Sequence, residues 1–268
     1  MLKEVIVFVA FLITLTSHAQ HATSTYVCPP CDNTCDTKTF KKGGLCDVCH
    51  MKLITKEQLQ MDMENKKNTE IKTIAFYLQD GVEVLDFAGP MEVFAYAGYK
   101  VFTVSKTKEY IISQGILKIK PDYSIKDAPE ADVLAFFGGN AHNAYEDKEV
   151  MKWVQDRTNV DLYFSVCTGA LVLAKAGVLD GNTATTFHSA LEGLEKNYPK
   201  VKVRRDVRFV DNGKVITTAG VSAGIDGALH LVARFQGLEK AKEVAFYMEY
   251  DKWKPGEGLI LTKENPYK

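Results

Sequence analysis

The pattern of apolar and polar positions divides the chain near residue 70. After that point, short β-rich apolar runs alternate with segments of helical periodicity. We expect strands over 71–78, 101–104, 132–137, 160–166 and 184–187, and helices over 90–97, 146–157, 168–176, 189–197, 222–235 and 238–250. A polar-edged ribbon is expected over 111–119, and a hairpin over 208–217 with Asp211-Asn212-Gly213 at its turn. This alternation predicts an α/β domain with a mainly parallel sheet covered by helices on both faces.

The first apolar run predicts an export signal. Lys3 precedes an apolar run over residues 5–15, which is too short to cross about 30 Å of hydrocarbon as a helix. Ser17-His18-Ala19 supplies small residues for cleavage after Ala19, and Gln20 stands where a lipoprotein would need cysteine. A buried first helix or strand is the alternative. We expect an exported, periplasmic protein with no stable membrane span in its mature chain.

Five of the six cysteines lie within a short segment and predict a metal-binding module. Cys28-x-x-Cys31 and Cys46-x-x-Cys49 form two knuckles, and Cys35 lies between them. Two such knuckles build a tetrahedral thiolate site for zinc or a similar soft divalent metal, in a small zinc-ribbon-like fold. The intervening residues are too polar to bury a core, so a metal must supply the folding energy. Two alternatives stay open: disulfides, and covalent haem at Cys46-Asp47-Val48-Cys49-His50.

The same segment resembles the short heavy-metal-binding domain found beside metal-handling proteins. The matching positions are Tyr26, Cys28, Pro29, Cys46, Cys49, Met51 and Leu53. Whether Cys35 is also a ligand is left open. We therefore divide the chain into a signal peptide (1–19), a cysteine module (20–55), a charged linker (56–70), a large domain (71–250) and a polar tail (251–268).

Charge and motifs exclude some classes of partner. The net charge is −1 and the pI is near 6.6, which gives no reason to expect nucleic acid. No glycine-rich phosphate-binding motif follows the first strand, so a nucleotide cofactor is unsupported and the large domain requires none. We expect a small-molecule substrate or ligand, and a homodimer is left open.

The sixth cysteine stands where a site is expected in such a sheet. Ligands bind beyond the carboxyl ends of parallel strands, and Cys167 connects the run 160–166 directly to a helix. This is the thiol counterpart of a nucleophile elbow. The backbone N–H of Thr168 can stabilise a developing anion, and the helix N-terminus predicts a pKa of Cys167 below the unperturbed ~8.5. A buried structural cysteine is the alternative.

Other candidates fall at neighbouring strand ends. Asp86 precedes the expected helix start at Pro90, and apolar neighbours should raise its pKa, so it could donate a proton. Gly138 and Gly139 could let backbone N–H groups approach a substrate oxygen, or form only a turn. His188 could supply a base or be structural. We expect His230 to serve packing and His142 to have at most weak ligand potential.

Taken together, these motifs resemble the ThiJ/PfpI superfamily, which has the class I glutamine amidotransferase-like fold. The resemblance covers about residues 71–250. It is carried by Asp86-x-x-Gly89-Pro90-x-Glu92-Val93-Phe94, Cys167-Thr168-Gly169-Ala170, Ala184-Thr185-Thr186 and Thr218-Ala219-Gly220-x-Ser222-Ala223-Gly224-x-Asp226. It implies a flavodoxin-like three-layer sandwich. The most similar subgroup holds isonitrile hydratases and the amidase-like domain of certain transcription regulators.

The resemblance implies a reaction and residue roles. The residue matching Cys167 attacks an isocyanide carbon, the one matching Asp86 handles a proton, the one matching Thr168 contributes, and water then releases an N-formamide. Protease-like members have His after the nucleophile, where Thr168 stands, so peptidase activity is not expected. Phe187 occupies a position where many relatives have His, which puts a catalytic role of His188 in doubt. The chain ends eighteen residues after Tyr250 without a DNA-binding helix pair, so a regulator is not expected.

Three functions compete at this point. The first is an exported cysteine-dependent hydratase or hydrolase acting on a small carbon–nitrogen compound. The second is a non-enzymatic thiol sensor or protective protein in which Cys167 is oxidised reversibly. The third is a metal-handling protein whose large domain only binds a ligand.

Overall fold

The protein is described by a computed structural model, which covers residues 25–267 except 30, 32–33, 61–70 and 72. The predicted signal peptide, its cleavage site and most of the predicted linker lie outside the described residues. The chain forms two compact units, Met1–Asn68 and Thr69–Lys268. In the part of the chain that the structure describes, no helix is long and apolar enough to cross a membrane.

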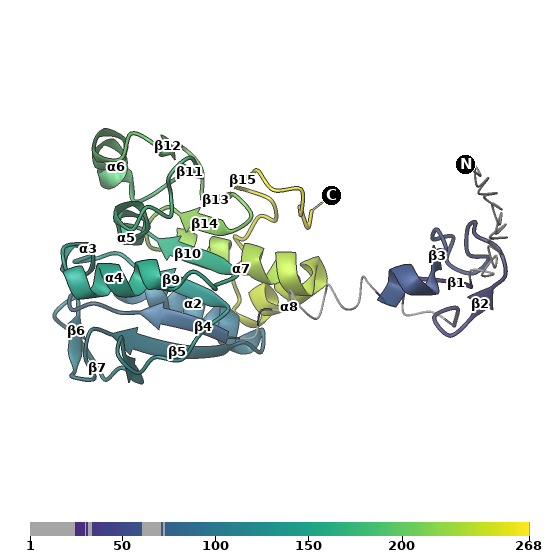
Figure 1. The fold of residues 1–268 in the computed structure, drawn as a ribbon, viewed down its shortest axis with the longest axis horizontal. Coiled ribbons are helices and arrows are strands. Elements are labelled where there is room, and N and C mark those ends of the chain that lie inside the picture. The colour runs from purple at the N-terminus through teal and green to yellow at the C-terminus, as the bar shows by residue number, and fades with distance from the viewer. Residues whose placement is uncertain (1–24, 30, 32–33, 61–70, 72, 268) are drawn as a thin grey trace, which may run out of the picture. The chain divides into compact units, whose positions relative to one another are not determined.

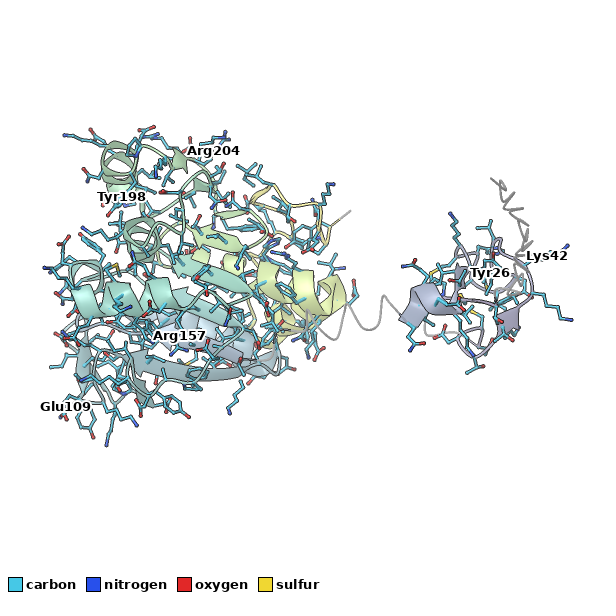
Figure 2. All side chains as sticks on the ribbon, in the orientation of Figure 1. Tyr26, Lys42, Glu109, Arg157, Tyr198 and Arg204 are labelled. Carbon is cyan, nitrogen blue, oxygen red and sulfur yellow. The ribbon has the colours of Figure 1, made fainter. Side chains whose placement is uncertain are left out.

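The smaller unit is built around its cysteines. Three two-residue strands, β1 (Tyr26–Val27), β2 (Thr39–Phe40) and β3 (Ile54–Thr55), form an antiparallel sheet in the order β2-β1-β3. Its buried residues are Val27, Cys28, Cys35, Cys46 and Leu53. Tyr26, labelled in Figure 2, packs its ring against Gly43, where a β-carbon would lie only 3.0 Å from the ring. Three of these five buried residues are cysteines, so the described part of the unit has little aliphatic core.

The larger unit contains an eight-stranded sheet in the order β15-β13-β14-β10-β9-β4-β5-β8. Every pairing in it is parallel except β13 with β14. The strands are β4 (Thr73–Tyr77), β5 (Lys100–Ser105), β8 (Tyr123–Ser124), β9 (Val133–Phe136), β10 (Leu162–Val166), β13 (Phe209–Asp211), β14 (Val215–Thr218) and β15 (Leu259–Ile260). Two small pairs lie outside it: β6 (Ile111–Ser113) with β7 (Leu117–Ile119), and β11 (Thr183–Ala184) with β12 (Lys202–Val203).

Helices cover both faces of this sheet (Figure 1). Alternate residues of β4 face two separate cores, because successive side chains of a strand point to opposite faces. Ile74 and Phe76 pack with residues of the helices α2 (Val84–Tyr96), α7 (Ala223–Gln236) and α8 (Leu238–Tyr247). Ala75 and Tyr77 pack with residues of α3 (His142–Tyr145), α4 (Lys148–Asp156), α5 (Gly169–Lys175) and α6 (Leu191–Asn197), the last preceded by the 3₁₀ turn His188–Ala190. The predicted three-layer, mainly parallel architecture is confirmed.

The expected strand 184–187 is reduced to β11, outside the main sheet, and two further local features differ from the sequence prediction. Helix α2 begins at Val84, six residues before Pro90, so Asp86 lies in its first turn and Pro90 lies inside it. The sequence argument took Pro90 as the first helical residue because proline favours that position. In the expected polar tail, β15 pairs with β13 and extends the sheet. A two-residue strand is too short to leave a periodic signal.

Candidate active site and candidate metal centre

Four segments that follow neighbouring strands converge at one edge of the sheet. They come after the carboxyl ends of β4, β9, β10 and β14, which are adjacent in the sheet, and they carry Asp86, Gly138, Cys167 and the loop 219–222. The chain passes from β4 to β5 on one side and then to β9 on the other, so the strand order reverses between β4 and β9. Open α/β sheets bind their ligands at such a reversal.

Cys167 occupies a strained turn between β10 and α5. Its φ of 59° lies in the left-handed region, which costs a residue other than glycine of the order of 1–3 kcal/mol. Two hydrogen bonds hold it there. Its N–H donates to the carbonyl of Ala219 at 2.9 Å, and its carbonyl accepts from the Thr186 hydroxyl at 2.7 Å. The thiol is 6% exposed. The sharp turn predicted from the sequence is therefore present.

The carboxyl group of Asp86 is completely buried beside this thiol. One oxygen accepts the N–H of Gly138 at 2.7 Å, and the other accepts the N–H of Val221 at 3.1 Å. The carboxyl group also hydrogen-bonds the thiol of Cys167. Asp86 thus connects its own segment to the three other converging segments. The N–H groups of Gly138 and Val221 hold its two carboxyl oxygens in place.

Burial raises the pKa of both members of this pair. The pKa of Asp86 rises to about 6, mainly through loss of hydration, although the N–H groups of Gly138 and Val221 oppose the rise. The predicted direction is confirmed. The pKa of Cys167 rises to about 12, first through burial and then through the negative charge of Asp86. The predicted lowering is therefore wrong: hydrogen bonds from the Thr168 N–H and hydroxyl favour the thiolate, but desolvation outweighs them.

The other residues predicted at this edge lie in the same region. The Gly138 N–H is engaged by Asp86. Gly139, with φ 82°, lies where a β-carbon would sit 2.3 Å from the Gly81 carbonyl oxygen. The backbone N–H of Thr168 reaches the Cys167 sulfur, and its hydroxyl lies 3.5 Å from the Gly139 carbonyl. Thr168 thus supplies the amide beside the sulfur, and an oxyanion role for either glycine stays a prediction.

A cavity of about 680 Å³ adjoins the segments that hold Cys167. Thr186 and Ala219, which hydrogen-bond the Cys167 backbone, line it, whereas Cys167 and Asp86 do not. Its charged and polar lining comes from His188, Asp206, Arg208 and Glu257. The His188 ring lies 4.2 Å from that of Phe187. The volume suits a small organic molecule, and the catalytic role of His188 stays a prediction.

The two other histidines considered as candidates, His142 and His230, do not line this cavity. His142 is the first residue of α3. His230 is fully buried, with Nε2 2.8 Å from an Asp211 oxygen and Nδ1 2.9 Å from the Tyr267 hydroxyl. It thus joins α7 to the C-terminal segment by polar contacts, which the expected packing role did not include.

Sequence reasoning missed the loop between β14 and α7 as a part of the site. Val221 donates its N–H to Asp86 while holding a φ of 53°, a conformation that is a genuine outlier for a β-branched residue. Nothing in the sequence marks a valine for that conformation. The motif from Thr218 to Asp226 gave the only signal, through its resemblance to the family pattern.

The small unit places four thiols around one point. The sulfur atoms of Cys28, Cys31, Cys35 and Cys49 all lie within 4.8 Å of one another. All six cysteines are described, and the structure assigns no disulfide among them. The predicted ligand set had Cys46 in place of Cys35. Cys46 is buried beside the group and its sulfur contacts those of Cys28 and Cys35. Four sulfur donors suit a soft metal ion in tetrahedral coordination, so the group is able to hold one.

Comparisons with known proteins cover the larger unit. The model of the DJ-1/PfpI family matches residues 72–234. Isonitrile hydratase of Pseudomonas putida is 34% identical over 180 residues, which cover 66% of this chain and 78% of that protein. The HTH-type transcriptional regulator CdhR of Pseudomonas aeruginosa is 28% identical over 178 residues, 63% of this chain and only 52% of its own length.

Solved structures agree with this match. A ThiJ/PfpI family protein from Pseudomonas syringae superimposes with a TM-score of 0.64 at 30% identity, over 69% of this chain and 77% of that one. Drosophila melanogaster DJ-1beta gives a TM-score of 0.59 at 25% identity, over 67% of this chain and 98% of that one.

Proposed function

The chain belongs to the DJ-1/PfpI family, and on that premise we propose that its large unit is a cysteine-dependent hydratase of small carbon–nitrogen compounds, with isocyanides as the first substrate class. The observation that carries the proposal is the buried Cys167–Asp86 pair at the strand-order reversal. The similarity to an isonitrile hydratase supports the substrate class. The cavity of about 680 Å³, which is lined by the backbone partners of Cys167 and not by Cys167 or Asp86, has a volume that suits a small molecule.

The first step joins the substrate to the sulfur. A Cys167 pKa near 12 means that the sulfur carries its proton at neutral pH, whereas an Asp86 pKa near 6 leaves the carboxylate charged. Asp86 therefore accepts the thiol proton while the sulfur attacks the isocyanide carbon, and then delivers that proton to the same carbon. The product is a thioimidate, R–N=CH–S, with Asp86 charged again. The Thr168 N–H beside the sulfur stabilises its developing charge.

The second step consumes one water molecule. Water adds to the thioimidate carbon as Asp86 accepts a proton from it and passes that proton to nitrogen. The carbon–sulfur bond then breaks and the hydroxyl proton returns to sulfur. The products are an N-substituted formamide and free Cys167, so the net reaction is R–NC plus water giving R–NH–CHO. One carboxylate serves both steps because its pKa lies close to neutral pH.

The proposal is tested by direct product detection. The purified chain is incubated with a small alkyl isocyanide, and with the corresponding nitrile and primary amide in separate reactions. We expect NMR to show the N-alkyl formamide from the isocyanide, and no product from the Cys167→Ser variant. Intact-mass analysis of a quenched reaction should show the thioimidate adduct on Cys167. Equal product with wild-type and Cys167→Ser protein would overturn the proposal.

For the small unit, the four-thiol group favours a second, separate function: binding a zinc-like ion. Cys28, Cys31 and Cys49 are common to the predicted and the observed group. Thiolate donors and a unit whose core is largely cysteine match structural zinc sites, in which metal binding supplies folding energy. Elemental analysis of full-length protein purified without chelator should find about one zinc equivalent per chain. Disulfides among these cysteines in the native protein would overturn it.

The N-terminal segment supports export as a further part of the proposal. Its apolar run and the small residues before Gln20 are those of a cleaved secretory signal. Expression of the full gene in a bacterial host, followed by mass analysis of the periplasmic fraction, should yield a chain that begins at Gln20. Recovery of an uncleaved chain from the cytoplasm alone would contradict this location.

A further inference from the structure

We propose that Arg208 is a positioning residue for the Cys167–Asp86 pair, acting through the loop 219–222. The inference rests on the proposed function only in taking this pair as the reactive centre. Arg208 lies just before β13, outside the converging segments, and is half-buried with a side chain 36% exposed. Its contacts reach both ends of the loop that holds the pair.

At the first end of the loop, the Arg208 backbone carbonyl accepts the N–H of Ala219 at 2.9 Å. At the other end, its guanidinium Nη2 donates to the Ser222 hydroxyl at 3.2 Å. The same guanidinium also binds Asp226 in the first turn of α7. Its Nε donates to Oδ2 at 2.7 Å, and its Nη2 donates to the same oxygen. Residue 208 therefore contacts the four-residue loop at its start through its backbone and at its end through its side chain, and only the second contact depends on arginine.

Residues of the loop 219–222 contact the reactive pair directly. The Ala219 carbonyl accepts the Cys167 N–H, and the Val221 N–H donates to Asp86. Val221 holds its contact only in a backbone conformation that valine avoids. A strained residue persists only where its surroundings hold it, and the Arg208 contacts on either side provide that hold.

Asp226, the carboxylate partner of Arg208, is itself held by a second contact. Asp226 is 7% exposed, and its second oxygen accepts the hydroxyl of Tyr250 at 3.2 Å. A buried carboxylate needs a charged partner, and the planar guanidinium of Arg208 donates to both Asp226 and Ser222. Loss of the guanidinium should therefore lower overall stability as well, and the pH dependence of the reactive pair is the quantity that separates the positioning role from stability.

The test uses the pH dependence of Cys167 alkylation by iodoacetamide, followed by peptide mass spectrometry without any substrate. In wild-type protein we expect an acid inflection near pH 6, where Asp86 titrates. Burial and the charge of Glu83 raise that pKa, whereas the N–H groups of Gly138 and Val221 and the thiol of Cys167 lower it. Arg208→Met should therefore move the inflection upward by about one pH unit as the Val221 contact is lost. Arg208→Lys should restore part of the difference.

Matched variants separate positioning from stability. Arg205→Met removes a surface pair with Glu195 and should leave the inflection at the wild-type pH. If Arg208→Met does not fold, Ser222→Ala removes only the loop contact of the guanidinium and should shift the inflection in the same direction. Superimposable profiles of wild-type protein and of the folded Arg208 or Ser222 variant would overturn the inference. A wild-type protein that fails to hydrate isocyanides, with the shift still present, would overturn the proposed function alone.

Discussion

The carboxyl group of Asp86 and the sulfur of Cys167 meet over the α-carbon of Gly138. A β-carbon at that position would lie 2.7 Å from the Asp86 Oδ2 atom and 2.7 Å from the Cys167 Sγ atom. The glycine therefore provides the space in which the two groups approach each other, while its N–H fixes the carboxyl group. The carboxyl group and the thiol can therefore approach each other closely because Gly138, which follows β9, has no side chain.

Gly138→Ala should separate the pair. The added methyl group must displace a buried carboxyl or a buried thiol, and such overpacking costs about 1–3 kcal/mol in the free energy of unfolding. We also expect at least tenfold slower alkylation of Cys167 at pH 7.5. Gly193→Ala is the matched control, because nothing lies within 4 Å of its added β-carbon and alanine favours helix α6. Unchanged alkylation in Gly138→Ala would contradict the steric argument.

Asp86 should make the stability of the protein depend on pH. Its folded-state pKa is raised from 3.8 to about 6, so between these values the folded state holds a proton that the unfolded chain has lost. The resulting stabilisation is complete below pH 4 and disappears as the pH rises through 6. It amounts to about 3 kcal/mol as an upper figure.

The measurement compares wild-type protein with Asp86→Asn by urea unfolding at pH 4 and at pH 8. Taking the difference between the two proteins cancels the titrating groups that do not interact with Asp86. Relative to the variant, wild-type protein should lose up to about 3 kcal/mol over this range. A difference that stays constant with pH would show that Asp86 keeps an ordinary pKa.

The sequence predicted the architecture because buried parallel strands leave continuous apolar runs, as at 160–166. It also predicted the sharp turn at Cys167, since strand and helix patterns meet there without a loop. It could not predict the start of α2, because Pro90 is a familiar helix start and its tolerance inside a helix depends on the local backbone. The direction of the Cys167 pKa depends on burial and on a neighbouring charge, and neither is visible locally.

The chemistry of Cys167 should follow from its raised pKa. Above the inflection of Asp86, iodoacetamide alkylation of Cys167 should keep increasing to a second midpoint above the ~8.5 of a free cysteine. Asp86→Asn removes a negative charge beside the sulfur, so this midpoint should fall, while burial still holds it above 8.5. Peptide mass spectrometry separates Cys167 from the five other thiols. A wild-type midpoint below 8.5 would indicate a resting thiolate and remove the need for Asp86 as a base.

The C-terminal segment should stabilise the large unit through Tyr267. Its hydroxyl lies 2.9 Å from Nδ1 of the buried His230, whose other nitrogen lies 2.8 Å from an Asp211 oxygen. Tyr267→Phe leaves that nitrogen without its partner and should lower the free energy of unfolding by about 1–3 kcal/mol. Tyr110→Phe, at a residue that is 53% exposed, is the control and should change it by less than about 0.5 kcal/mol. Equal effects of the two substitutions would argue against the anchor.

The fourth ligand of the metal site should be Cys35 rather than Cys46. Cys35 belongs to the group of four sulfur atoms within 4.8 Å of one another, whereas the two-knuckle pattern of the sequence selected Cys46. One tetrahedral ion takes four thiolates and leaves the fifth cysteine as a buried thiol beside the site. Cys35→Ser should therefore weaken zinc binding by at least tenfold, and Cys46→Ser should still bind about one ion per chain.

Cobalt titration monitored by visible absorption measures this difference, because a tetrahedral thiolate site gives intense cobalt bands that weaken when a sulfur ligand is lost. Cys167→Ser is the control, since Cys167 lies in the other unit and its loss should leave the spectrum unchanged. Intense bands in Cys35→Ser together with weak bands in Cys46→Ser would reverse the assignment and return Cys46 to the ligand set. In that case metal binding must rearrange the second knuckle, because Cys46 lies outside the group of four sulfur atoms.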